Sequence, residues 1–247
     1  MSADAIERCR VVLVETHYPG NLGATARVMF NFGLRDLVLV SPRAERTDKN
    51  ALQMSTHGQP ILDNARTVSD LDAAIGDCVL VVGTSARVGG LFRQQNVGPP
   101  AEIMPHVVDV IQQGRPAALV FGPEPTGLSN DIVTRCHHLV QIPTGDAYPA
   151  LNLAQAVAIC LYELRLTLLQ ARVPVADAER ATMDAQEPMF RQLQTAFEEI
   201  HFLYGDKAEP LMHALRHMLG KARLSDMEVR LLLGLARQIR WYVANHP

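Results

Sequence analysis

The sequence lacks the features of membrane and secreted proteins. No apolar run approaches the roughly 18 residues that a membrane helix needs, and the first ten residues, MSADAIERCR, contain no apolar signal segment. The four cysteines are scattered without a C-x-x-C pair, and Cys136-His137-His138 lacks the spacing of a metal site. These absences predict a reduced cytoplasmic protein with no membrane partner and no metal.

The chain also has little net charge. Its 23 basic and 26 acidic residues give a net charge of −3, so bulk charge gives no indication of a nucleic-acid partner. Basic residues gather only near the C-terminus, where residues 216–240 hold six basic residues and two acidic ones. Such a cluster is more often a solvated helix face than a binding surface.

Short apolar runs recur through the first two thirds of the chain. They are continuous rather than alternating, which is typical of strands buried on both faces of a parallel sheet. Helical segments between them end at glycines suited to a left-handed C-cap, namely Gly33, Gly76 and Gly114. The runs are 11–14, 37–40, 79–82, 117–121 and 139–142. This order predicts an α/β domain with a parallel sheet and flanking helices over residues 1–171.

The pattern changes in the last third of the chain. Residues 172–188 contain two prolines and are predicted to form a linker, and residues 189–247 show helical periodicity without strand patterns. Ser225 with Glu228 three residues later forms a capping box that predicts the start of the last helix. Three arginines fall on one side of that helix: Arg230, Arg237 and Arg240.

Ligands of open α/β sheets bind beyond the carboxyl ends of the strands, so we examine the loops that follow the strands. The first loop leads through Gly20 and Gly23 into a helix whose N-terminus favours an anion, and Arg27 lies one turn into that helix. The loop after the third run has small residues that allow a ligand close to the backbone, followed by Arg87.

The last two loops are equally informative. Residues 121–128 hold two prolines and two glycines, which predicts a rigid turn. Glu124 in such a turn more often accepts backbone N–H groups than performs catalysis. Asn152 opens an otherwise apolar helix, where a buried amide needs a partner, either backbone or ligand.

Read in order, these loops resemble the motifs of the SPOUT superfamily of knotted RNA methyltransferases, in its SpoU/TrmH-like group. Each motif alone is weak, but all four follow predicted strands and span residues 11–160. The loop Gly83-Thr84-Ser85-Ala86-Arg87 and the tail Ala222-Arg223-Leu224-x-x-x-Glu228-Val229-Arg230 are similar to the TrmJ-like branch, whose members are tRNA ribose 2′-O-methyltransferases. The other motifs are Asn21-x-Gly23-x-x-x-Arg27, Phe121-Gly122-x-Glu124-x-x-Gly127-Leu128 and Leu151-Asn152-Leu153-Ala154-x-Ala156-Val157.

The resemblance implies a fold and a cofactor that composition cannot show. It implies a deep trefoil knot formed by the last strands and the long helix from Leu151. It also implies a homodimer with active sites at the subunit interface, and S-adenosylmethionine bound in the knot. The residues expected to bind the cofactor are Thr84, Ser85, Ala86, Gly122, Ile142, Ala150 and Leu151.

The resemblance further places Arg27, from the neighbouring subunit, against the substrate nucleotide. A guanidinium stays protonated in proteins, so we expect it to stabilise the developing alkoxide and hold a phosphate. Arg87 is expected to contact phosphate or ribose and Asn152 to orient the substrate or the knot backbone, which completes the catalytic set. The substrate-binding set is Asn21, Arg27, Glu124, Arg230, Arg237 and Arg240.

Two positions depart from the pattern of the branch, Pro123 where Arg is common and Ala150 where Ser is common. The predicted function is S-adenosylmethionine-dependent 2′-O-methylation of tRNA, at the pyrimidine that begins the anticodon loop. The alternatives are rRNA 2′-O-methylation and a non-catalytic knotted dimer that binds RNA, which the two departures favour. A nicotinamide-dependent Rossmann enzyme does not fit, because no G-x-G-x-x-G follows any strand.

Overall fold

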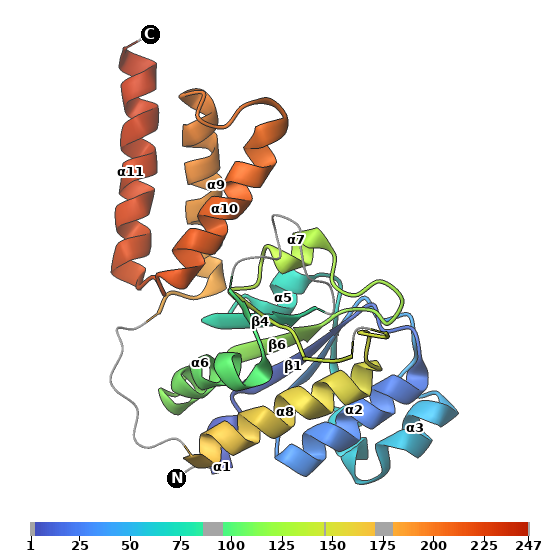
Figure 1. The fold of residues 1–247 in the computed structure, drawn as a ribbon. Helices are drawn as coiled ribbons and strands as arrows, with labels where there is room; N and C mark the ends of the chain where they lie inside the picture. Colours follow the sequence, from blue (N-terminus) through green and yellow to red (C-terminus); the bar gives the residue numbers. More distant parts are fainter. Residues whose placement is uncertain (1–2, 86–95, 146, 171–179, 247) are drawn as a thin grey trace.

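The computed structural model describes residues 3–85, 96–145, 147–170 and 180–246. These residues form an α/β part and a helical C-terminal part that stands beside one edge of the sheet (Figure 1). The predicted class, α/β with a parallel sheet, flanking helices and a helical C-terminal extension, is confirmed. The trefoil knot stays a prediction.

The strands form one parallel sheet. Within the described residues they are β1 (Cys9–Val14), β2 (Leu37–Val40), β3 (Arg66–Val68), β4 (Leu80–Thr84), β5 (Val97–Gly98), β6 (Ala117–Phe121) and β7 (His138–Val140). Their order is β3-β2-β1-β6-β4-β7-β5, with every neighbouring pair parallel. All five predicted runs form strands. The two edge strands, β3 and β5, are not predicted by the pattern of apolar runs.

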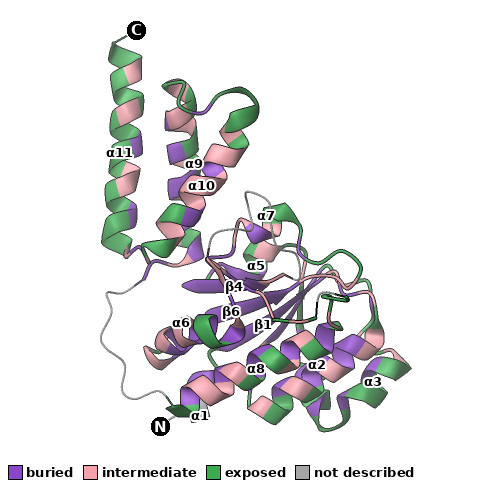
Figure 2. Cartoon of the chain, viewed as in Figure 1, coloured by how far each residue is buried: buried purple, intermediate pink, exposed green. Residues whose placement is uncertain are grey.

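Helices cover both faces of the sheet, whose strands are almost entirely buried between them (Figure 2). One face is covered by α2 (Pro19–Phe32), α6 (Pro100–Gln112) and α8 (Leu153–Gln170), and the other by α5 (Leu71–Ile75) and α7 (Asn130–Val133). The other helices of this part are α1 (Ala3–Ile6), α3 (Lys49–Ser55), the 3₁₀-helix η1 (Thr56–Gly58) and α4 (Gln59–Asp63).

Glycines end these helices in two ways. Gly33 and Gly114 adopt the left-handed conformation, with φ of 83° and 81°, as predicted. Gly76 ends α5 in the right-handed conformation, with φ of −57°, so that part of the prediction is wrong.

Among the helices that the structure describes, α8 is long and apolar enough to cross a bilayer by length and composition alone. It packs against α2 and α6, with Val157, Leu161 and Leu164 fully buried. Packing inside the α/β part therefore accounts for much of its apolar character.

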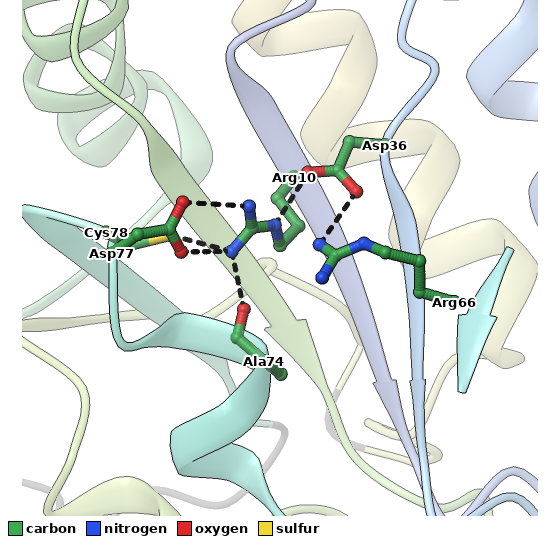
Figure 3. A network of polar contacts seen from close by, with 6 residues as sticks. All are labelled: Arg10, Asp36, Arg66, Ala74, Asp77 and Cys78. Atoms are coloured by element: carbon green, nitrogen blue, oxygen red, sulfur yellow. Dashed lines mark hydrogen bonds and ion pairs between the residues drawn. The ribbon is translucent and has the colours of Figure 1, made fainter. Parts of the chain in front are cut away.

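Arg10 joins three elements at the amino edge of the sheet (Figure 3). Its guanidinium donates to the Asp77 carboxylate at 2.6 and 3.1 Å, to Asp36 at 2.7 Å and to the Ala74 carbonyl at 2.6 Å. Arg66 donates to the same Asp36 at 3.2 Å. The hydrogen bond from Arg10 lowers the pKa of Asp77. A buried and fully paired guanidinium thus ties β1 to the segments that precede β2 and β4.

The C-terminal part is a small helical bundle. It consists of α9 (Met183–Glu199), the 3₁₀-helix η2 (Gly205–Lys207), α10 (Ala208–Lys221) and α11 (Asp226–Asn245). The predicted linker, 172–188, extends too far, because α9 begins at Met183 and accommodates Pro188 inside the helix. The capping box of Ser225 and Glu228 is confirmed at the start of α11.

Main-chain hydrogen bonds attach this bundle to the amino edge of the sheet. The N–H of Met183 donates to the Cys78 carbonyl at 3.1 Å, and the N–H of Asp184 donates to the Gly76 carbonyl at 3.0 Å. Gly76 and Cys78 lie just before β4. The bundle is therefore docked at the edge opposite to the carboxyl ends of the strands.

Ion pairs of one buried glutamate strengthen this junction, and two histidines lie close to it. Glu187 of α9 forms ion pairs of 2.7 Å with Arg135 of the α/β part and with Arg216 of α10. Nearby, burial lowers the pKa of His137 to about 4 and that of His138 to about 3. Both imidazoles are therefore neutral at pH 7.

Candidate active site

A cavity of about 290 Å³ opens at the carboxyl ends of β4, β6 and β7, where α/β sheets bind their ligands. Its volume is at the lower end of the range for small-molecule sites, about 300–1,000 Å³. The loops after these three strands line it, together with the first turn of α8. They are the loops that the sequence identifies as candidate sites.

The loop after β4 contributes Thr84 and Ser85 to the cavity wall. The N–H of Ser85 donates to the Val140 carbonyl at 3.0 Å and so continues the pairing of β4 with β7. Ala86 and Arg87 lie outside the described residues, and their predicted roles stay predictions.

The loop after β6 depends on its glycines. A Cβ on Gly122 would lie 2.4 Å from the backbone carbon of Gly127 and from the backbone nitrogen of Leu128. Gly127 has a φ of 68°, in the left-handed region, and its N–H donates to the Pro123 carbonyl at 2.8 Å. These two glycines fold the loop back on itself, which presents its main chain to the cavity.

The loop after β7 closes the cavity toward α8. Ile142, Pro149, Ala150 and Leu151 line the wall. The hydroxyl of Thr144 donates to the Pro149 carbonyl at 3.2 Å and holds the two ends of the loop together. Position 150 presents only a methyl group here, so the hydroxyl common in the TrmJ-like branch is missing from this wall.

A chain of side-chain hydrogen bonds joins the loop after β1 to the loops after β6 and β7. Glu124 accepts from the His17 backbone N–H at 3.0 Å and from the Asn21 amide nitrogen at 2.6 Å. The oxygen of Asn21 accepts from the amide nitrogen of Asn152 at 2.9 Å. The oxygen of Asn152 accepts from the Ala154 N–H at 2.9 Å and caps α8. Glu124 thus takes the structural role expected of it, and Asn152 pairs with both backbone and side chain.

The chemistry of the wall fits S-adenosylmethionine. Apolar side chains such as Phe121 and Leu128 offer contacts to an aromatic base, and Glu124 places a negative charge beside a cationic ligand. Of the residues predicted to bind the cofactor, six line this cavity: Thr84, Ser85, Gly122, Ile142, Ala150 and Leu151. That they bind it stays a prediction.

Arg27 does not line the cavity of its own chain. It lies on the exposed side of α2, three residues before Phe30, whose exposed fraction is 45%. Within the described ranges, no hydrogen bond or ion pair occupies its guanidinium. A catalytic role for this side chain therefore requires a substrate or a second chain to come to it.

The arginines of α11 divide into two groups. Arg230 and Arg237 are exposed, and among the residues that the structure describes Arg230 donates only to the carbonyl of Asp226, at 3.3 Å. Arg240 turns toward α9 and forms an ion pair with Glu199 at 2.9 Å. Its charge is therefore partly neutralised, which helical periodicity alone does not predict.

Sequence reasoning missed several cavity residues at the strand ends and on α8. Phe121 and Val140 end β6 and β7, while Leu153 and Ala156 lie three residues apart on α8. Leu153 and Ala156 belong to the motif that begins at Leu151, and their spacing of three residues indicates that they share one face of a helix.

The family model and the relatives below define the class as an S-adenosylmethionine-dependent RNA methyltransferase, and the cavity at the carboxyl edge of the parallel sheet agrees with that class. The chain belongs to the SpoU methylase family, since the model of the SpoU rRNA Methylase family matches residues 8–162. The model of the tRNA methyltransferase TrmJ C-terminal domain matches residues 184–246.

Individual relatives cover almost the whole chain. The tRNA (cytidine/uridine-2′-O-)-methyltransferase TrmJ of Yersinia enterocolitica is 36% identical over 95% of this chain and 92% of its own. The tRNA (cytidine/uridine/adenosine-2′-O-)-methyltransferase TrmJ of Pseudomonas aeruginosa is 34% identical over 93% of each chain. The crystal structure of TrmJ from Z. mobilis ZM4 has a TM-score of 0.78 at 27% identity, covering 94% of this chain and 98% of that one.

Proposed function

We propose that this protein is an S-adenosylmethionine-dependent tRNA 2′-O-ribose methyltransferase that acts on the pyrimidine at the start of the anticodon loop. The observation that carries the proposal is the cavity, which gathers the predicted cofactor loops on a chain similar to TrmJ relatives along nearly its whole length. Those relatives are named for 2′-O-methylation of cytidine and uridine in tRNA.

The residues of the chain act mainly by positioning and by electrostatics. S-adenosylmethionine, when bound, supplies an electrophilic methyl group, so the remaining task is to orient the ribose hydroxyl and to stabilise its oxygen as the proton leaves. Arg27 stabilises that developing negative charge and holds the adjacent phosphate, which takes the proton. Asn152 orients the loop before α8, and Arg87 contacts phosphate or ribose.

A homodimer is part of this proposal, and an apolar stripe on α8 supports it. Ile159, Tyr162 and Leu169 are exposed and recur at helical spacing, with exposed fractions of 37%, 55% and 65%. The ring of Phe32 on the neighbouring helix α2 contacts Tyr162, with ring centroids 6.5 Å apart, and Arg27 lies on the same helix five residues earlier. A second copy seated on this stripe would bring its own Arg27 close to the cavity across the interface. Ile159→Glu is expected to produce a monomer, detected by light scattering, that has no methyltransferase activity.

The C-terminal bundle, residues 189–247 with the start of α9, is proposed to bind RNA through Arg230 and Arg237, with a smaller contribution from the paired Arg240. Binding through phosphates makes tRNA affinity fall steeply with salt. We expect Arg230→Gln with Arg237→Gln to weaken tRNA binding and flatten its salt dependence while S-adenosylmethionine binding is unchanged. Unchanged tRNA affinity would contradict this role. A cytoplasmic location, where tRNA is found, belongs to the same proposal.

The proposal is tested by methyl transfer from labelled S-adenosylmethionine to unmodified tRNA transcripts, with the product nucleotide identified by mass spectrometry. A 2′-O-methylated pyrimidine at the start of the anticodon loop is the expected result. Arg27→Ala is expected to abolish turnover but not cofactor binding, whereas the control Arg35→Ala, at an exposed arginine paired with Glu7, leaves both intact. Cofactor binding without transfer to any tRNA would indicate an rRNA substrate. If the wild type neither binds S-adenosylmethionine nor transfers a methyl group, the result would indicate the non-catalytic dimer.

A further inference from the structure

Two tyrosines stand exposed in the loops around the cavity. Tyr18 follows β1 and is 58% exposed, and Tyr148 follows β7 and is 79% exposed. Each is followed directly by a proline, Pro19 or Pro149. Large aromatic side chains normally bury much of their surface, so two of them in water beside one cavity call for a ligand.

Hydrogen bonds join the two loops that carry the tyrosines beside the cavity. Tyr18 follows His17, whose N–H donates to the cavity residue Glu124 at 3.0 Å. Tyr148 precedes Pro149, which itself lines the cavity. The loops that carry them are joined by the bond of 2.9 Å between Asn21 and Asn152, three and four residues beyond the tyrosines.

The backbone of each tyrosine is held in place. A residue before proline is restricted to extended conformations, and Tyr18 has φ of −107° and ψ of 118°. Its carbonyl accepts the N–H of Asn21 at 3.0 Å. The N–H of Tyr148 donates to the Gly145 carbonyl at 3.3 Å. Anchored aromatics with few free dihedrals lose little entropy when they bind a flat partner.

We infer that Tyr18 and Tyr148 form a stacking platform for unpaired bases of the RNA substrate at the target nucleotide. The inference rests on the proposed function and specifies its substrate as a single-stranded loop. Unstacked bases in RNA loops are commonly bound on aromatic side chains, because every base has a π-face. Neither tyrosine lines the cavity, so the platform acts on RNA and not on the cofactor.

The test compares stacking with truncation. Tyr18→Ala and Tyr148→Ala are each expected to raise the KM for tRNA roughly 5- to 150-fold, the loss of one stacked base. Tyr18→Phe and Tyr148→Phe keep the ring and stay within about 2-fold of wild type, because stacking needs no hydroxyl. The affinity for S-adenosylmethionine is unchanged in all four. Arg35→Ala, at an exposed arginine paired with Glu7 outside both proposed RNA-binding surfaces, is the control.

A second readout is independent of turnover. An anticodon stem-loop with a fluorescent base next to the target nucleotide is expected to be quenched on binding wild type and the Phe variants, but not the double Ala variant. Alanine variants with the same KM for tRNA as Arg35→Ala would overturn the platform. So would alanine variants whose affinity for S-adenosylmethionine falls by the same factor as their KM for tRNA rises. A wild type that quenches the fluorescence without methylating tRNA would refute the proposed function and keep the platform.

Discussion

The hydrogen-bond chain from Glu124 through Asn21 to Asn152 has a direction that two substitutions can reverse. A carboxylate only accepts, so Glu124 compels Asn21 to donate with its nitrogen and to accept with its oxygen. Asn152 must then donate to Asn21 and accept from the Ala154 N–H. Glu124→Gln converts one acceptor into a donor, and Asn152→Asp converts one donor into an acceptor.

Each single substitution leaves one mismatched pair. In Glu124→Gln, the remaining oxygen serves the His17 N–H while the new amide faces the amide nitrogen of Asn21. In Asn152→Asp, the cap on Ala154 survives but the second oxygen faces the oxygen of Asn21. An unsatisfied buried group costs about 1–3 kcal/mol. Because Asn21 is buried but Glu124 is only half-buried and Asn152 is exposed, we expect each variant to lose about 1–2 kcal/mol of unfolding free energy, the lower part of that range.

The double variant satisfies every group again. The new amide at position 124 donates to the oxygen of Asn21, and Asn21 donates to the new carboxylate at position 152. The other oxygen of that carboxylate accepts the Ala154 N–H, at a helix N-terminus that favours negative charge. We therefore expect the double variant to lie within about 0.5–1 kcal/mol of wild type, which is a strong coupling for a neighbouring pair.

Urea unfolding of the four proteins measures the coupling, provided that the slope is the same in all of them. Isothermal titration with S-adenosylmethionine separates charge from stability, because Glu124 lines the cavity and both variants with Gln at position 124 lose its negative charge. Strictly additive losses in the double variant would show that the direction of the chain does not matter, and would refute the reasoning.

Three further predictions concern the cavity, the junction with the C-terminal bundle and the amino edge of the sheet. Gly122→Ala should weaken S-adenosylmethionine binding at least about 10-fold, since its Cβ would lie 2.4 Å from backbone atoms, whereas Gly145→Ala, with no atom within 4 Å, should bind normally by titration calorimetry. Unfolding free energy should fall by roughly 1–3 kcal/mol from pH 7 to pH 5, because His137 and His138 stay neutral when folded but gain protons below pH ~6.5 when unfolded; urea titration at each pH measures it. Arg10→Met should cost about 2–3 kcal/mol in the same assay, below the usual range for buried pairs because Asp77 is largely exposed, and should leave KM unchanged.

The sequence predicts the central strands well and the edge strands poorly. The buried strand β6 is a continuous run of apolar residues, and β1 is one from Val11 to Val14, which is the signal that the parallel sheet requires. β3 is only three residues long and begins with the exposed Arg66 and Thr67, and β5 has two residues. Edge strands this short bury too little surface to leave a hydrophobic pattern.

The cavity was predictable because of topology, and its internal bonding was not. Parallel strands bring their following loops to one edge, so the residues at 84, 122, 142 and 150 are expected to meet before any contact is known. The partner of Asn152 is Asn21, 131 positions away. No local pattern indicates that pair, because both amides have several possible partners within their own loops.

The C-terminal bundle shows a similar limit, with a functional consequence. Helical periodicity correctly places α11 but cannot show that Arg240 faces Glu199, or that the bundle docks beside Cys78 at the amino edge. β4 alone has five residues, about 16 Å of strand between that edge and the cavity. In the proposed RNA-binding role, Arg230 and Arg237 would therefore contact a part of the RNA distant from the cavity of the same chain. An RNA that reaches both must be larger than an isolated loop, which matches a folded tRNA better than a short single strand.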